Sequence, residues 1–161
     1  MKTSIERSFS LKAAAKLFRF SRRPLLSLTP SICFRQIIFS DEKDFTIPIG
    51  KANISRKGKD VTLVTYSIML QKSLLAADQL KKDYDIEVEI IDLQSLRPLD
   101  VNTIIESVKK TNRLITVEES WPINSLGSEI ANIVQRETFD YLDSPIIKVN
   151  SADVPMPYSS F

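Results

Sequence analysis

Histidine is absent from this sequence of 161 residues, which has only one cysteine, one tryptophan and three glycines. The lack of histidine removes the usual general base near neutral pH and the most common metal ligand. Cys33 alone allows neither a disulfide within the chain nor a zinc site with several cysteine or histidine ligands. Gly50, Gly58 and Gly127 are too few for a phosphate-binding loop or a dinucleotide-binding fingerprint. We therefore assign no catalytic, cofactor-binding or metal-binding residue from the sequence.

Charge is distributed unevenly along the chain, although the formal net charge is only +2. Residues 1–40 contain eight basic residues, one acidic residue and seven serines, whereas residues 41–161 contain fourteen basic and nineteen acidic residues. An N-terminus that is rich in arginine and serine and poor in acids is typical of an organelle transit peptide. We predict a leader over residues 1–40 and one domain over residues 41–161, with no nucleic-acid partner.

The leader has the pattern of an amphipathic helix. Its basic residues and its apolar residues fall on adjacent faces, with Lys12, Lys16, Arg19 and Arg23 on one and Phe9, Ala13, Leu17 and Phe20 on the other. The segment from Pro24 to Ile32 has too few apolar residues in a row to cross a membrane, so we predict no integral membrane segment. A mitochondrial transit peptide would place the protein in the mitochondrial matrix. Another organelle matrix and the cytoplasm remain alternative locations, and a disordered basic arm or a faulty gene model remains an alternative origin of the leader.

Strand-like and helix-like segments alternate from residue 44 onward. Short β-branched runs predict strands, and apolar residues at helical spacing predict helices between them. The predicted strands cover residues 61–67, 88–93, 114–117 and 146–149, and the predicted helices cover residues 68–82, 100–110 and 125–135. Residues 49–55 come before this pattern and are followed by the turn signal Lys57-Gly58-Lys59, which indicates an antiparallel edge strand.

This alternation predicts an α/β domain with a mostly parallel sheet that is covered by helices on both faces. Asp100 is the predicted N-cap of the second helix. Several aliphatic residues are expected to face the sheet: Leu70, Leu74, Ala77 and Leu80 in the first helix, Ile104, Ile105 and Val108 in the second, and Leu126, Ile130, Ile133 and Val134 in the third.

Glu118 and Glu119 follow the predicted strand at residues 114–117. Ligands of open α/β sheets bind at the carboxyl ends of strands, so an acid there would act on a substrate or pair with an arginine of a partner. The ordinary alternative is a solvated or helix-capping pair. Trp121 lies beside Pro122 in the same loop, where an aromatic side chain is more typical of packing or of a protein interface than of catalysis.

Arg97 and Arg113 also follow the ends of predicted elements. They would either anchor a carboxylate across a subunit interface or form ordinary salt bridges with Asp92 or Asp100. Together with Glu118, Glu119 and Trp121, these arginines are the interface candidates of the chain.

Four segments in a fixed order resemble a known family. They are residues 45–52, residues 92–100 with Arg97-Pro98-Leu99-Asp100, residues 107–119, and residues 152–158 with Val154-Pro155-Met156-Pro157-Tyr158. Over residues 44–158 the sequence is similar to the C-terminal domain of pyruvate dehydrogenase β subunits, within the transketolase C-terminal group. The branched-chain 2-oxoacid dehydrogenase β subunit has the same architecture and is the second candidate.

The resemblance implies a three-layer α/β/α domain with a five-stranded mixed sheet. It also implies an assembly with an α subunit and a second β subunit that decarboxylates pyruvate on thiamine diphosphate and Mg²⁺ and delivers the acetyl group to a dihydrolipoyl acyltransferase core. In that family the catalytic residues of the β subunit belong to its N-terminal domain, which no segment here matches. We therefore expect this chain by itself to bind no cofactor and to be inactive, and to contribute subunit interfaces or to act as a non-catalytic interaction module.

Three departures separate the chain from the family pattern. The loop at residues 120–126 lacks the family's usual glycine and its frequent histidine or glutamine. Relatives also continue beyond the position of Phe161 and have a domain before residue 44. A truncated isoform, a gene fragment and an incomplete gene model each account for these differences.

Overall fold

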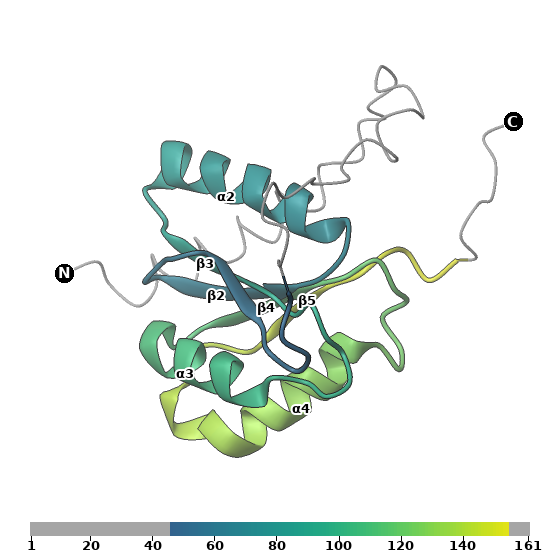
Figure 1. The fold of residues 1–161 in the computed structure, drawn as a ribbon. Coiled ribbons are helices and arrows are strands. Elements are labelled where there is room, and N and C mark those ends of the chain that lie inside the picture. The colour runs from purple at the N-terminus through teal and green to yellow at the C-terminus, as the bar shows by residue number, and fades with distance from the viewer. Residues whose placement is uncertain (1–45, 155–161) are drawn as a thin grey trace, which may run out of the picture.

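The computed structural model describes residues 46–154, and the predicted leader and the proline-rich end from residue 155 onward lie outside the described residues. Strands and helices alternate as the sequence predicts (Figure 1). In chain order the elements are β1 (Asn53–Arg56), β2 (Val61–Thr65), α2 (Met69–Tyr84), β3 (Val88–Asp92), α3 (Val101–Thr111), β4 (Leu114–Val117), α4 (Leu126–Thr138), the short 3₁₀ helix η2 (Phe139–Tyr141) and β5 (Ile147–Val149).

The five strands form one mixed sheet in the order β1-β3-β2-β4-β5. Strands β2 to β5 are parallel, and β1 pairs with β3 in the antiparallel direction, which confirms the predicted edge strand. The strand begins at Asn53, later than predicted. Gly50 has φ of +77° and turns the preceding chain, while the Ala52 amide donates to Asp100 instead of to a strand.

Helices cover both faces of the sheet, as the pattern predicts (Figure 1). Helix α2 packs on one face, over a core that includes Leu63, Ile90 and Ile115. Helices α3 and α4 pack on the other face, where Val64 and Ile91 point. These strand residues alternate between the two faces because successive side chains of a strand point in opposite directions. The α/β/α architecture is therefore confirmed.

The helix boundaries follow local signals. Asp100 and Ser125 are the N-caps of α3 and α4, and their side chains accept hydrogen bonds from the amides of Thr103 and Ser128. The last turn of helix α2 contains Lys81 and Lys82, whose positive charges suit the negative end of the helix dipole.

Burial of the predicted helix faces is uneven. Ile104, Val108, Ile130 and Val134 are fully buried as expected, as are Ala77 and Leu80 of α2. Leu70, Leu74 and Leu126 are only partly buried, packed at the margin of the two cores. Ile105 and Ile133 are also half-buried, because a straight helix brings only its central apolar rows into contact with a sheet.

Candidate functional site at the carboxyl edge of the sheet

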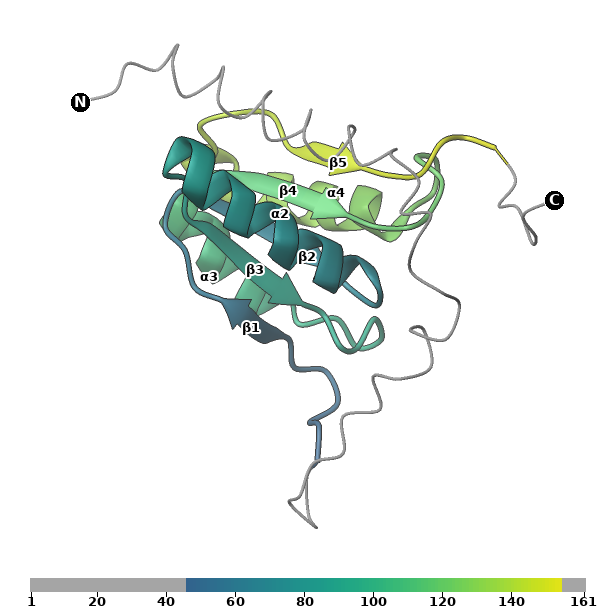
Figure 2. The ribbon, with the colours of Figure 1, turned by 90° about the horizontal axis from the view of Figure 1, so that it is seen from above.

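Five segments of the chain meet at the edge where the parallel strands end. Strand β1 runs in the opposite direction, so the residues that enter it lie at the same edge as the residues that leave the other strands (Figure 2). We define this carboxyl edge by residues 46–52, 66–68, 93–100, 118–125 and 150–154. It contains four of the five interface candidates: Arg97, Glu118, Glu119 and Trp121.

Glu118 is the centre of the polar contacts at this edge. It directly follows β4, and only 2% of its surface is exposed. Its Oε1 accepts hydrogen bonds from the Gly127 amide at 3.0 Å and from Asn150 Nδ2 at 2.9 Å, and its Oε2 accepts from the Tyr66 hydroxyl at 3.1 Å. One carboxylate therefore connects the ends of β2, β4 and β5 to the first turn of α4. Glu118 thus acts as the cap that was the ordinary alternative, whereas its neighbour Glu119 is exposed.

Tyr66 shares this environment. Burial raises the pKa of the Tyr66 phenol above its ordinary value, and the adjacent Glu118 carboxylate raises it further. The phenol therefore stays protonated and donates to Glu118 throughout the physiological range. Sequence reasoning missed Tyr66 and Asn150 as partners of Glu118, and the only signal for them is that each directly follows a strand.

The loop after β4 is joined to the chain after β5 by further contacts. The Ser151 amide donates to the Ser120 carbonyl at 3.0 Å, and Trp121 Nε1 donates to the Val154 carbonyl at 3.0 Å. The indole is nevertheless 51% exposed. Trp121 is therefore anchored by its polar atom while its ring remains accessible, as in many interface tryptophans.

Arg97 lies at the other end of the carboxyl edge, in the loop between β3 and α3. Pro98 closes this loop against the chain that enters β1, since a Cβ on Gly50 would lie 2.8 Å from Pro98 Cγ. Asp100 joins the same two segments by accepting from Ala52 N at 3.0 Å. Arg97 itself is exposed and forms no ion pair within the described residues.

The predicted salt bridges of Arg97 and Arg113 with Asp92 or Asp100 do not form among the described residues. Arg113 lies at the opposite, amino edge of the sheet, where it pairs with Asp143 at 3.0 Å and donates to the Asp60 carbonyl. It contacts neither Asp92 nor Asp100, because parallel strands put the residue before β4 and the residue after β3 at opposite edges. Arg113 thus holds together the segments before β2 and β5, and it is not close to the other four candidates.

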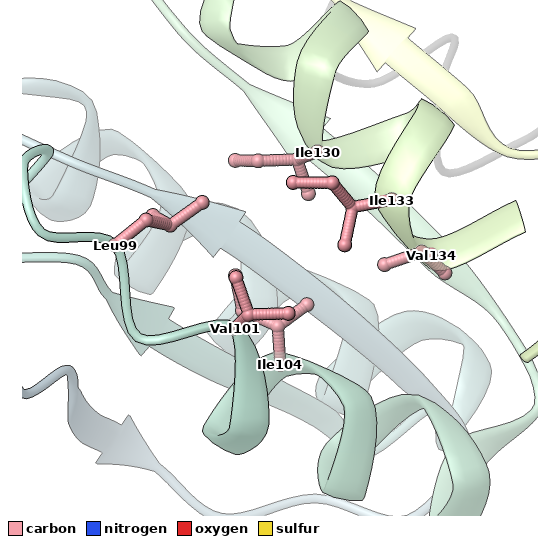
Figure 3. Close-up of a pocket in the computed structure, with 6 residues that line it drawn as sticks. All are labelled: Leu99, Val101, Ile104, Ile130, Ile133 and Val134. Atoms are coloured by element: carbon pink, nitrogen blue, oxygen red, sulfur yellow. The ribbon is translucent and has the colours of Figure 1, made fainter. Parts of the chain in front are cut away.

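A groove between α3 and α4 is apolar throughout (Figure 3). Its lining side chains are all aliphatic: Leu99, Val101, Ile104, Ile130, Ile133 and Val134. A group with charged phosphates needs convergent donors or a metal, and this groove has neither. Among residues 46–154 no group of three or more potential ligand side chains could hold a metal ion.

Two carboxylates of the carboxyl edge are buried. Both of them accept hydrogen bonds from within the domain. Glu118 accepts three hydrogen bonds, and Asp100 accepts from Ala52 and Thr103. Both carboxylates stabilise loops and helix ends.

Comparison with known proteins agrees with this architecture. Residues 50–160, more than half of the chain, match the family model of the transketolase C-terminal domain. The chain is 54% identical over 117 residues to the pyruvate dehydrogenase E1 component subunit beta of Rhizobium meliloti, and 52% identical over 119 residues to the mitochondrial subunit beta-2 of Oryza sativa. The matches cover 73% and 74% of this chain.

A solved structure is also similar. It is described as a split gene transketolase, an inactive beta4 tetramer, and it shares 34% sequence identity with a TM-score of 0.62. The match covers 70% of this chain and 36% of that one. The matches cover only 25% and 31% of the length of the two curated relatives. Within residues 46–154 no helix has the length and hydropathy to span a membrane. By its sequence and its fold, this chain belongs to the transketolase C-terminal domain family.

Proposed function

We propose that this chain is the C-terminal domain of a pyruvate dehydrogenase β subunit and that it contributes subunit contacts, while the reacting groups come from elsewhere in the assembly. The observation that carries this proposal is the state of Glu118. It stands where an α/β domain would present a catalytic acid, yet it is buried and the three hydrogen bonds that it accepts all come from within the domain. The identity of about half to pyruvate dehydrogenase β subunits supports the choice of pyruvate over a branched 2-oxoacid.

The partners follow from the same similarity. In this proposal the chain binds a pyruvate dehydrogenase α subunit and a second β chain, and it contributes to the surface that meets a dihydrolipoyl acyltransferase core. In this proposal, thiamine diphosphate and Mg²⁺ belong to the assembled enzyme. The exposed Trp121 ring is of the type that anchors protein contacts.

A mitochondrial location is part of the proposal. It is supported by the Arg- and Ser-rich composition of residues 1–40 and by the mitochondrial relative from Oryza sativa. Fusion of residues 1–40 to a fluorescent protein, followed by imaging, tests it. Fluorescence that remains diffuse in the cytosol would contradict this part alone.

The main test combines binding and activity. The purified chain is mixed with a matching α subunit and examined by size-exclusion chromatography, then assayed for pyruvate decarboxylation with a dye acceptor, thiamine diphosphate and Mg²⁺. We expect co-elution with the α subunit and no activity above the α-only control. Failure to co-elute would contradict the proposed contacts, and activity above the control would show that this chain supplies reacting groups.

A further inference from the structure

The described helices cover the two faces of the sheet unequally. Helices α3 and α4 lie on one face, whereas α2 lies on the other, where it packs chiefly against β2 and β3 (Figure 2). Among residues 46–154 no second helix accompanies α2 on its face. An apolar sheet face needs a second layer of structure over its whole width. The described helices therefore leave the part of this face formed by β4 and β5 without a layer of its own.

This part of the face is apolar. Four residues of β4 and β5 point to the α2 side, and we call them the β4–β5 strip: Ile115, Val117, Ile147 and Val149. The two residues of β4 are each only 1% exposed, and the two residues of β5 are half-buried. Strand β5 is the edge of the sheet, where side chains without a covering layer would be open to solvent. Burial to this degree requires a cover beside α2.

The side of α2 that borders the strip is apolar as well. Asp78 of α2 pairs with Arg56 of β1, so the Asp78 side of the helix points away from β4. Ala76 lies two residues earlier, about 200° away around the helix, and therefore points to the strip. Met69 shares this side with Ala76, and both are half-buried. A helix beside α2 would thus meet small or flexible apolar side chains.

The predicted leader has the chemistry of this cover. Its apolar face recurs every three or four residues over residues 9–20, at Phe9, Ala13, Leu17 and Phe20. A helix over this range is about 18 Å long, and the four residues of β4 span about 13 Å, so one such helix covers the strip from end to end. The basic residues lie on the adjacent face of the helix and stay in water.

The connection between the leader and the domain is long enough for this contact. The described part of the chain begins at residue 46, in the segment that enters β1. Strand β5 is at the opposite edge of the five-stranded sheet, about 20 Å from β1 at the usual strand spacing. Residues 21–45 extend over about 80 Å at most. Because the leader is tethered to the domain, a contact within one chain is favoured over a contact with a second copy.

We infer that residues 9–20 pack as a helix on the β4–β5 strip, beside α2, so that the chain covers its own apolar surface as long as it carries the leader. A leader that served only as a free targeting signal or as a basic arm would leave the strip open to solvent. The inference goes beyond the proposed function and does not depend on it, since it concerns contacts within one chain. It is therefore tested on the full chain alone.

Protection of a thiol on the strip tests this contact. Cys33 is the only cysteine of the chain, so Cys33→Ser gives a background in which Ile147→Cys places a single thiol on the strip. We expect this thiol to react slowly with a maleimide. Ala13→Asp puts a charge in the middle of the leader's apolar face, and burial of an unpaired charge is unfavourable. It should therefore release the leader and raise the labelling rate of Ile147→Cys about tenfold or more.

Ala15→Asp is the matched control. It makes the same substitution about 200° away around the predicted helix, so it changes net charge and helix propensity as Ala13→Asp does but leaves the apolar face intact. It should change the labelling rate of Ile147→Cys by no more than about twofold. Asn132→Cys, at an exposed position of α4, controls for the reagent and should be labelled rapidly whichever leader is present.

A cross-link supplies a second measurement that needs no disruptive charge. In the Cys33→Ser background, a short bis-maleimide should join Ala13→Cys to Ile147→Cys within one chain, whereas Ala15→Cys should be joined to Ile147→Cys much less. This measurement decides the question where circular dichroism shows that Ala13→Asp prevents folding.

Four results would overturn the inference. They are rapid labelling of Ile147→Cys with the unmodified leader, equal effects of Ala13→Asp and Ala15→Asp, cross-links only between chains, and protection that is lost on dilution. The last two would identify a second copy as the cover of the strip. Failure to bind the α subunit would contradict the proposed function and leave all these outcomes unchanged, so the two can fail separately.

Discussion

At the scale of single residues, two adjacent glutamates have opposite roles. Glu118 is buried and accepts three hydrogen bonds, whereas Glu119 is exposed and free of partners within the described residues. The two side chains point in opposite directions, because successive side chains at the end of a strand lie on opposite faces of the sheet. Glu118 therefore points to the side where α4 begins and Glu119 points to solvent.

Replacement of Glu118 by alanine should destabilise the domain. The change leaves the buried Gly127 amide without its acceptor and removes one acceptor of Asn150, and a buried polar group without a partner costs about 1–3 kcal/mol. Chemical denaturation monitored by circular dichroism measures this loss. Glu119→Ala is the matched control and should change the free energy of unfolding by less than about 0.5 kcal/mol. Equal effects of the two substitutions would contradict the role given to Glu118.

Gly127 illustrates a steric requirement at the same site. A Cβ there would lie 2.5 Å from Glu118 Oε1 and 2.6 Å from Thr116 Oγ1, so α4 approaches β4 too closely for any side chain. Glycine is unfavourable in a helix by about 1 kcal/mol relative to alanine, so helix propensity and the steric requirement oppose each other at this position.

Gly127→Ala should therefore destabilise the domain despite the better helix propensity of alanine. Relief of the clash must displace the Glu118 carboxylate from its donors or move α4, and we expect a net loss of about 1–3 kcal/mol in thermal or chemical unfolding. Asn132→Ala, at an exposed position of the same helix, should be neutral or slightly stabilising. A Gly127→Ala variant as stable as the unmodified chain would show that α4 is free to shift.

At the scale of elements, Asp100 connects two segments that are far apart in the sequence. It caps α3 through Thr103, and it accepts a hydrogen bond from the Ala52 amide, 48 residues away. Burial by itself raises the pKa of Asp100, but these hydrogen bonds and the nearby Lys51 outweigh it and lower the pKa below 3.8. The carboxylate form thus holds both the start of α3 and the entry into β1.

Asp100→Ala should cost about 1–2 kcal/mol of stability, because it removes the cap and the bond to the Ala52 amide together. Asp100→Asn keeps an acceptor of the same shape and should lose less. Hydrogen exchange provides the local measurement, since the Thr103 and Ala52 amides should exchange faster in the alanine variant. Unchanged protection of the Ala52 amide would contradict the link between the two segments.

At the scale of the whole molecule, a buried acid connects the sheet to α3 near the amino edge. Glu89 of β3 is 1% exposed and accepts hydrogen bonds from Lys110, from Ser107 and from the Gly58 amide. Burial by itself raises the pKa of Glu89, but the three donors, and Lys110 foremost, lower it below its ordinary 4.5. A lowered pKa means that the unfolded chain binds the proton more tightly than the folded chain does.

The stabilisation from Glu89 should therefore be present above pH 4.5 and lost as the pH falls through the lower folded-state value. Glu89→Gln removes this dependence and should cost about 1–3 kcal/mol at pH 7. Thermal unfolding at pH 7 and at pH 3 is the measurement. The gap between the melting temperatures of the two proteins should narrow at pH 3, and a gap that widens on acidification would contradict this sign.

Much of the fold was predictable from the sequence, because its signals are local. The strands at residues 88–93 and 114–117 are apolar or β-branched runs, and α3 begins at an aspartate of the N-cap type. Such patterns depend on neighbours within a few residues. The boundary of β1 was less predictable, since it is set by the contact of Ala52 with Asp100.

The sequence by itself determined the order of strands and helices along the chain, the burial of both faces of the sheet by helices, and the family to which the chain belongs. Only the tertiary structure decided which glutamate is buried and that Arg113 pairs with Asp143. Apart from the bond of Glu118 to the Gly127 amide, the contacts that produce these properties join residues 30 to 52 positions apart in the chain. Such residues meet only through strand order and register, which sequence periodicity does not specify.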